Sequence, residues 1–246
     1  MTGMKIAALL TGRGGSSLRD KNVRKVLGKP LLAYPALAAT GAGRITFFYV
    51  SSDDKKILDA ASRYGYVKIR RPEYLSAASA QHGDVIMHAL EVMEELYSVI
   101  PDVLVVLLAN SACVKTEWID DCIREIVKDR TLSAVVPVCE DSDHHPFRAK
   151  KMSAGGLLVP FFDFGKKKVS TNRQDLDPAY FLCHNFWVLN LKRSVFSEGG
   201  QKPWEFMGNR IKPYPIKECC DVHCEKDLIR TKEWIAQNLK KSKRGK

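Results

Sequence analysis

The sequence contains no long apolar run. No stretch of the 246 residues approaches the roughly 20 apolar residues that a membrane-spanning helix needs. The first ten residues also lack the layout of a cleavable signal peptide, because they carry one lysine and lead directly into a strand-like segment. These two absences predict a cytoplasmic protein without membrane contact.

Composition disfavours disorder and a disulfide framework. Hydrophobic residues make up 45% of the chain and charged residues 27%, so it can bury a sizeable core. The seven cysteines are odd in number and no secretion signal precedes them. Cys219, Cys220, His223 and Cys224 form a compact group that could bind zinc, but a second Cys or His pair at matching spacing is missing.

Acidic residues are scarce relative to basic ones. The chain has 28 Asp and Glu against 39 Lys and Arg, a formal net charge of +11 that suggests an anionic partner. The simplest interpretation is a solvated surface, and the sharper one is a cleft that holds a triphosphate and a carboxylate. We expect no nucleic-acid partner, because a recognition helix, an RNA-binding aromatic motif and paired zinc fingers are all lacking.

Strand-like and helix-like segments alternate along most of the chain. We predict strands at residues 4–11, 45–51, 66–69, 103–108, 132–138 and 180–191. We predict helices at residues 30–39, from 53 or 54 to 64, 82–97, 116–128 and 226–239, with Asp53 or Asp54 and Thr116 as N-caps. This alternation indicates an α/β fold with a doubly wound, mostly parallel sheet in a single domain over residues 1–246.

The alternation fails between residues 139 and 177. The segment contains His144, His145, Pro146 and the lysine run 166–168, without a periodic apolar pattern. A loop of this length inside a compact domain is usually functional or an interaction arm. An ordered surface loop is the alternative.

A glycine-rich segment from Gly12 to Asn22 follows the first predicted strand, where open α/β sheets place their ligands. Its glycines allow close approach of backbone N–H groups to phosphate oxygens, and Arg13, Arg19 and Lys21 add positive charge. The segment does not match the P-loop, and Ser17 stands where a dinucleotide-binding fingerprint needs its third glycine. The residues favour phosphate binding over a merely solvated turn.

The same residues resemble a known family. Residues 13–16, 21–22 and 28–34 are similar to the start of the acylneuraminate cytidylyltransferases, which make CMP-activated sialic, legionaminic, pseudaminic and related acids. Residues 50–54, 70–75 and 144–146 are similar to its Val-Ser-Thr-Asp-Asp, Arg-Pro-x-x-Leu and His-Pro elements. The resemblance spans most of the chain. It implies a fold like that of nucleotide-diphospho-sugar transferases, and a homodimer formed through an inserted arm at residues 139–177.

The resemblance also implies an activity and its residues. CMP would pass from CTP to an acidic sugar with release of pyrophosphate, as a step in cell-surface polysaccharide biosynthesis. The catalytic residues would be Arg13, Lys21 and Asp221. The nucleotide-binding residues would be Gly12, Arg13, Gly14, Gly15, Ser16, Lys21, Asn22 and Arg71. Asp221 and His223 would hold Mg²⁺, or Mn²⁺ because histidine offers a nitrogen ligand.

Three positions depart from the family pattern. His223 stands where the family has the second acid of its Asp-x-Asp motif, Ser17 replaces a lysine, and Ala109 replaces a glutamine that often meets the sugar. We therefore expect an acceptor other than ordinary sialic acid, with a catalytically reduced nucleotide- or sugar-binding relative as the alternative. His184 could act as a general base or be a satisfied strand histidine. Trp187, Trp204 and Trp234 are interpreted as core or dimer-contact residues.

Overall fold

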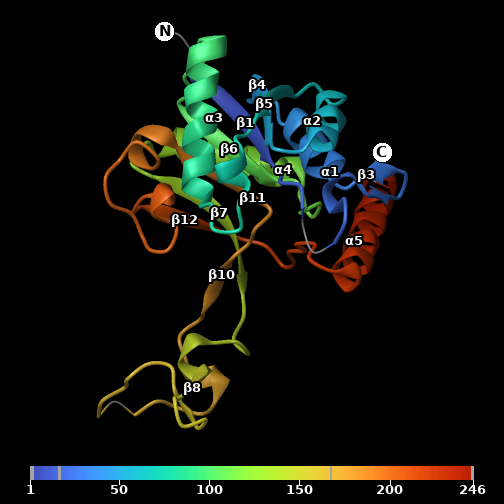
Figure 1. Ribbon diagram of the computed structural model, residues 1–246. Coiled ribbons are helices and arrows are strands. Elements are labelled where there is room, and N and C mark those ends of the chain that lie inside the picture. The colour runs from blue at the N-terminus through green and yellow to red at the C-terminus, as the bar shows by residue number, and fades with distance from the viewer. Residues whose placement is uncertain (1–2, 16–17, 167, 245–246) are drawn as a thin grey trace.

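The computed structural model describes residues 3–15, 18–166 and 168–244. Its centre is an eight-stranded sheet with the order β10-β7-β11-β6-β1-β4-β5, and β12 pairs with β7 (Figure 1). The strands of this sheet are β1 (Ile6–Thr11), β4 (Phe47–Ser52), β5 (Val67–Arg70), β6 (Val103–Leu108), β7 (Ala134–Glu140), β10 (Tyr180–Leu182), β11 (Phe186–Asn190) and β12 (Ile211–Pro215). Only β10 and β11 are antiparallel to their neighbours, which confirms a mostly parallel sheet.

Helices cover both faces of this sheet. They are α1 (Ala33–Thr40), α2 (Lys55–Ser62), α3 (His82–Tyr97) and α4 (Thr116–Lys128), whereas α5 (Glu225–Arg244) packs in a third core with Val26 and Leu31. Alternate side chains of β1 enter two separate cores: Ala8 and Leu10 pack with α1, α2 and α4, whereas Ala7 and Leu9 pack with α3. The doubly wound fold predicted from the alternating pattern is therefore confirmed. Among the described residues, no helix is both long and apolar enough to cross a membrane.

Most predicted elements are present, with local corrections. The 82–97 and 116–128 helices and the 103–108 strand have the expected bounds, and Asp54 caps α2 by accepting a hydrogen bond from the Lys56 backbone N–H at 2.8 Å. The prediction of Thr116 as N-cap was wrong. Lys115 holds that place, and the Thr116 hydroxyl donates to the Ala38 carbonyl at 3.0 Å.

Two further elements were not predicted as they stand. The helix expected from residue 30 begins at Ala33, because β2 (Lys25–Val26) and β3 (Lys29–Pro30) form a small hairpin whose turn residues Leu27 and Gly28 have positive φ. Strand β12, which holds two prolines, was missed. It pairs in parallel with β7 on the side away from β11, at the edge of the sheet.

The predicted strand 180–191 is broken, and the break matters for the site. Leu182 pairs with Val138, whereas Val188 pairs with Val135. Five residues, 183–187, therefore stand opposite only two residues, 136–137, on β7. The surplus chain bulges out of the ladder between β10 and β11, as extra residues do in β-bulges. This places His184 outside regular strand pairing.

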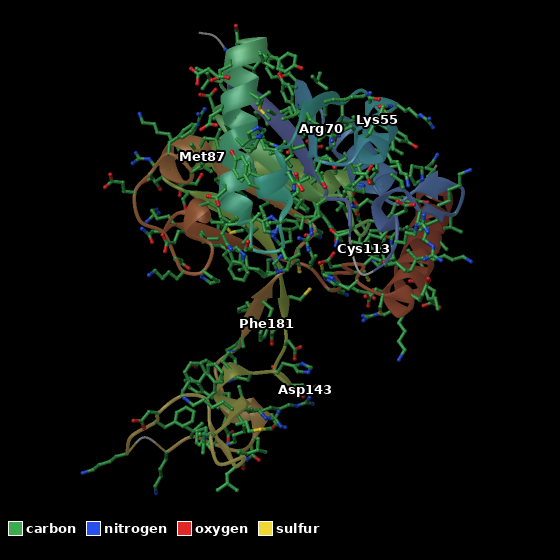
Figure 2. The ribbon with its side chains drawn as sticks, viewed as in Figure 1. Lys55, Arg70, Met87, Cys113, Asp143 and Phe181 are labelled. Carbon is green, nitrogen blue, oxygen red and sulfur yellow. The ribbon has the colours of Figure 1, made fainter. Side chains whose placement is uncertain are left out.

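A long arm leaves the body after β7 and returns through β10 (Figure 1). The Asp141 backbone N–H donates to the Ala179 carbonyl at 3.0 Å and closes its base. Within the arm, β8 (Lys150–Met152) and β9 (Leu158–Pro160) form a short hairpin. Figure 2 shows Phe181 in the neck and Asp143 farther out. The arm coincides with the segment 139–177 that lacked periodicity, and its role in joining two copies stays a prediction.

Candidate active site

A cleft of about 570 Å³ lies at the carboxyl ends of β1 and β6. Its walls come from the glycine-rich turn, the segment after β5, the start of α3, the bulge before β11 and the segment before α5. The lining residues are Thr11, Gly12, Arg13, Gly15, Lys21, Asn22, Arg71, Leu75, Ala77, Ala78, Ala80, His82, Val85, Leu108, Asn110, His184, Asp221 and His223. The cleft thus brings together residues that lie about 200 positions apart in the sequence.

Most of the residues predicted from the sequence border this cleft. Those present are Gly12, Arg13, Gly15, Lys21, Asn22, Arg71, Asp221 and His223. Gly14 faces a smaller neighbouring depression beside Asp54. Ser16, with Ser17, lies outside the described residues. The turn therefore opens onto a crevice at the edge of the sheet, as a phosphate-binding turn requires.

Steric contacts explain two glycines of the turn. A Cβ atom at Gly12 would lie 2.9 Å from the Cβ of Ala109, which is too close for any side chain. Gly15 has a φ of +62°, which glycine adopts without strain. Between them, the Gly14 N–H donates to the Asp53 carboxylate at 3.0 Å and joins the turn to the end of β4. These contacts fix the backbone before a ligand arrives.

Two cations of the turn are held by backbone carbonyls. The Arg13 guanidinium donates to the Ala77 carbonyl at 3.3 Å, and the Lys21 ammonium donates to the Val222 carbonyl at 2.9 Å. Burial lowers the pKa of Lys21, opposed by the charge of Asp221, while Arg13 lowers it further. An anionic ligand beside Lys21 would relieve this cost, because it would favour the charged ammonium.

Asn22 and Arg71 are buried polar groups in the lining of the cleft. The Asn22 side-chain amide donates to the Arg13 carbonyl at 3.1 Å, and its Oδ1 has no hydrogen-bond partner among the described residues. Arg71 donates to the Ser51 hydroxyl at 3.2 Å and to the Ser51 carbonyl at 2.8 Å. Burial lowers the pKa of Arg71 to about 10, with the charge of Asp53 opposing. Both side chains are preorganised by the body.

Asp221 is the one carboxylate in the described lining of the cleft. The Asn110 amide donates to its Oδ1, and the ring of His223 lies 2.9 Å from its Oδ2 through Nε2. Burial raises the pKa of Asp221, while the neighbouring charges of His223, Lys21 and His184 lower it. A buried carboxylate gains from a cation, so this group fits an oxygen-preferring ion such as Mg²⁺.

The other acidic residues near Asp221 are already engaged. Asp227 accepts hydrogen bonds from the backbone N–H groups of His223 and Cys224, both at 2.9 Å, and Glu225 pairs with Arg24 at 2.6 Å. Within the described ranges, no group of three or more His, Cys, Asp or Glu side chains could hold a metal ion. This argues against the zinc interpretation of the cysteine cluster and leaves Asp221 as the carboxylate available to a divalent ion.

Comparison with known proteins decides the family. A family model described as cytidylyltransferase matches residues 7–152. The chain belongs to the cytidylyltransferase family. The family expected from the glycine-rich turn is thus confirmed, and the enzyme class with it.

Similar proteins cover nearly the whole of this cytidylyltransferase. It is 31% identical to the CMP-N,N'-diacetyllegionaminic acid synthase of Legionella pneumophila, over 96% of this chain and 98% of the relative. It is 24% identical to the pseudaminic acid cytidylyltransferase of Campylobacter jejuni, over 92% and 94%. A solved CMP:2-keto-3-deoxy-manno-octonic acid synthetase in complex with CTP has a TM-score of 0.67 at 15% identity, over 95% and 99%. The last likeness supports the fold.

Three lining residues of this cytidylyltransferase were missed or misjudged from the sequence. His82 and His184 both meet the buried ring of Trp187 edge-on, at 5.4 and 5.9 Å between ring centroids. Their ring nitrogens have no hydrogen-bond partner in the part of the chain that the structure describes. His184 thus lies between β10 and β11 rather than in a strand, and its ring nitrogens make no hydrogen bond to a described residue. Asn110 lies two residues beyond β6, at the same sheet edge as Gly12, and that position was the signal available.

Trp187, Trp204, Trp234 and Ala109 are not among the residues that line the cleft. Trp187 is fully buried, Trp204 packs against the α3-side core, and Trp234 packs against a third core beside α5. The interpretation of these rings as packing residues is confirmed. Ala109 is buried behind Gly12 and does not line the cleft.

Proposed function

We propose that the protein transfers CMP from CTP to an acidic sugar and releases pyrophosphate. The observation that carries the proposal is the cleft itself, which combines a glycine-rich turn, the cations Arg13 and Lys21 and the buried carboxylate Asp221 at the carboxyl edge of the sheet. The family supports the choice of CTP. The names of the relatives, pseudaminic and legionaminic acid synthases, support a 2-keto sugar acid as acceptor.

In the proposed reaction, a hydroxyl oxygen of the acceptor attacks the α-phosphorus of CTP. A new P–O bond forms, and the bond between the α-phosphorus and the oxygen that bridges it to the β-phosphorus breaks, so that this oxygen leaves with pyrophosphate. The hydroxyl proton of the acceptor passes to solvent water. Lys21 and Arg13 exchange their carbonyl partners for phosphate oxygens and neutralise the charge that grows on pyrophosphate. Asn22 and Arg71 bind the nucleoside.

Asp221 is the proposed ligand of Mg²⁺ or Mn²⁺. Such an ion, when bound, neutralises phosphate charge and orients the leaving group. We propose that His223 assists Asp221 in holding the ion, since its Nε2 lies 2.9 Å from Asp221 Oδ2. The remaining ligands would be phosphate oxygens and water, as is usual for Mg²⁺ in proteins.

We further propose that two copies associate through the arm, and that the enzyme acts in the cytoplasm to supply CMP-sugar acids for cell-surface polysaccharides. The arm supports the first point, because its described residues expose large apolar side chains. These are Met152, Leu157, Leu158, Phe161, Phe162, Tyr180 and Phe181. A second copy of the chain would cover them.

Pyrophosphate release tests the activity. Purified protein should release pyrophosphate only when CTP, a divalent ion and a 2-keto sugar acid are all present. Arg13→Ala should lower kcat/KM by about 10- to 100-fold, because a charge-assisted hydrogen bond is worth roughly 1.5–3 kcal/mol. Arg19→Ala is the matched control from the same turn, since that side chain is 95% exposed and does not line the cleft.

The outcome separates the two candidate functions. Unchanged turnover in Arg13→Ala would remove this residue from the site. If CTP raises the melting temperature but no acceptor supports turnover, the protein is a nucleotide-binding relative with reduced catalysis, which His223 in place of an acid would favour. If CTP, ATP, GTP and UTP all leave the melting temperature unchanged, the proposed function fails.

A further inference from the structure

Both oxygens of Asp221 are occupied by side chains from different parts of the chain. Asn110, on the loop after β6, donates its amide N–H to Oδ1. His223, two residues beyond Asp221, brings Nε2 to within 2.9 Å of Oδ2. These two contacts fix the orientation of the carboxylate. Each oxygen keeps a further lone pair for a ligand in the cleft.

Asn110 is joined to the same segment by its backbone as well. The Val222 N–H donates to the Asn110 carbonyl at 3.1 Å, and the Asn110 amide also lies 3.4 Å from the Val222 carbonyl. Next to it, the Ser111 hydroxyl donates to the Cys220 carbonyl at 2.9 Å. These contacts attach residues 220–222 to the end of the central strand β6.

The two partners of Asp221 differ in how firmly they are held. The His223 side chain is 69% exposed, whereas Asn110 is half-buried between β6 and the 220–222 segment. The amide is also uncharged, so it orients the carboxylate without neutralising it. A rigid neutral donor of this kind leaves the full negative charge available to a cation.

We propose that Asn110 is the positioning residue of the metal-binding carboxylate, fixing Asp221 for a divalent ion that accompanies CTP. The inference deepens the proposed function and rests on it. In this role Asn110 acts through Asp221. A purely structural Asn110 would affect stability and CTP binding alike, with or without the ion.

Binding calorimetry with CTP and no acceptor tests the role without any turnover. Affinity for CTP is measured first in EDTA and then with saturating Mn²⁺, and the ratio gives the gain due to the ion. Asn110→Ala should lower the Mn²⁺ gain by about tenfold, the low end of what loss of a ligand-orienting partner costs, and any change of the affinity in EDTA cancels from this ratio. Asn209→Ala, in a loop where the amide donates to the Gly199 carbonyl, is the control and should change neither value.

A double-mutant cycle separates coupling from general damage. In Asp221→Asn the Mn²⁺ gain should be lost, and adding Asn110→Ala should lower it no further, because the two residues act as one unit. Asn110→Leu, which is similar in size but lacks a donor, repeats the test if the alanine variant folds poorly. A full Mn²⁺ gain in Asn110→Ala, or equal losses in both backgrounds, would overturn the role. A wild type that binds no CTP at all would instead overturn the proposed function.

Discussion

The body and the arm treat apolar side chains in opposite ways. In the body, the strands β1 and β6 are buried along their whole length on both faces. In the arm, His145 is the one buried residue among those described between positions 141 and 179, and Leu157, Leu158 and Met152 are each more than two-thirds exposed. The body is stabilised by its own core, whereas the arm has apolar surface without one.

This difference indicates that the body is stabilised by contacts within the chain and the arm by contacts with another molecule. Aromatic rings do meet in the arm, as Phe147 does with Phe164 at 5.3 Å, but the cluster is too small to exclude water. Exposed apolar surface of this kind is typical of protein contact sites. We therefore expect the body to be stabilised by its own core, and the arm to gain most of its stabilisation from a second copy of the chain in the proposed dimer.

Matched truncations should give the largest contrast. Leu104→Ala removes a fully buried side chain from β6 and should lower the free energy of unfolding by about 2–5 kcal/mol. Phe161→Ala removes a larger side chain that is 53% exposed and should change the stability of the monomer by less than about 0.5 kcal/mol. Urea unfolding at low protein concentration measures both. Equal losses would contradict the idea that the arm lacks a core.

Removing the arm sharpens the same comparison. A variant in which residues 142–178 are replaced by an Asn-Gly turn keeps the closing contact between Asp141 and Ala179. It should fold with nearly the melting temperature of the full chain. It should sediment as a monomer at concentrations where the proposed dimer of the full chain forms. Sedimentation velocity decides the outcome. Dimers in the shortened protein would show that another surface joins the copies.

The smallest effect is expected at His82, which lines the cleft and whose ring nitrogens have no hydrogen-bond partner among the described residues. Burial lowers the pKa of His82 below 6.5, and His184, Arg71 and Arg13 lower it further. The folded state then binds a proton less readily than the unfolded state, so stability falls as pH drops through about 6.5. His82→Gln should show a smaller loss of melting temperature between pH 7.5 and 5.5. Identical slopes would contradict this assignment.

The sequence predicted the parts of the fold that depend on local pattern. Long apolar runs and the 82–97 periodicity led to the right strands and helix, because burial on one or both faces sets those patterns. Strand β12 was not predicted, because its two prolines argue against a strand. They are tolerated because β12 pairs with β7 at the edge of the sheet. The bulge before β11 escaped because it depends on the register with a distant strand.

The candidate site divides in the same way. Residues of the glycine-rich turn were recognisable because glycine spacing and charge are visible in the sequence itself. Asn110 and His82 were not, because each borders the cleft only through the position of its strand or helix, and neither belongs to a motif. Asp221 is an intermediate case. Its motif suggested it from the sequence, but only the fold brings it into contact with Asn110, which lies 111 residues away.

The bond between Lys21 and the Val222 carbonyl spans 201 residues. During translation, the turn leaves the ribosome about 200 residues before the segment with Asp221 does. A nascent chain can therefore assemble strands β1 to β7 while it still lacks the carboxylate side of its cleft. A chain that stops before Asp221 would lack one wall of the cleft and, with it, the carboxylate that the proposed reaction needs.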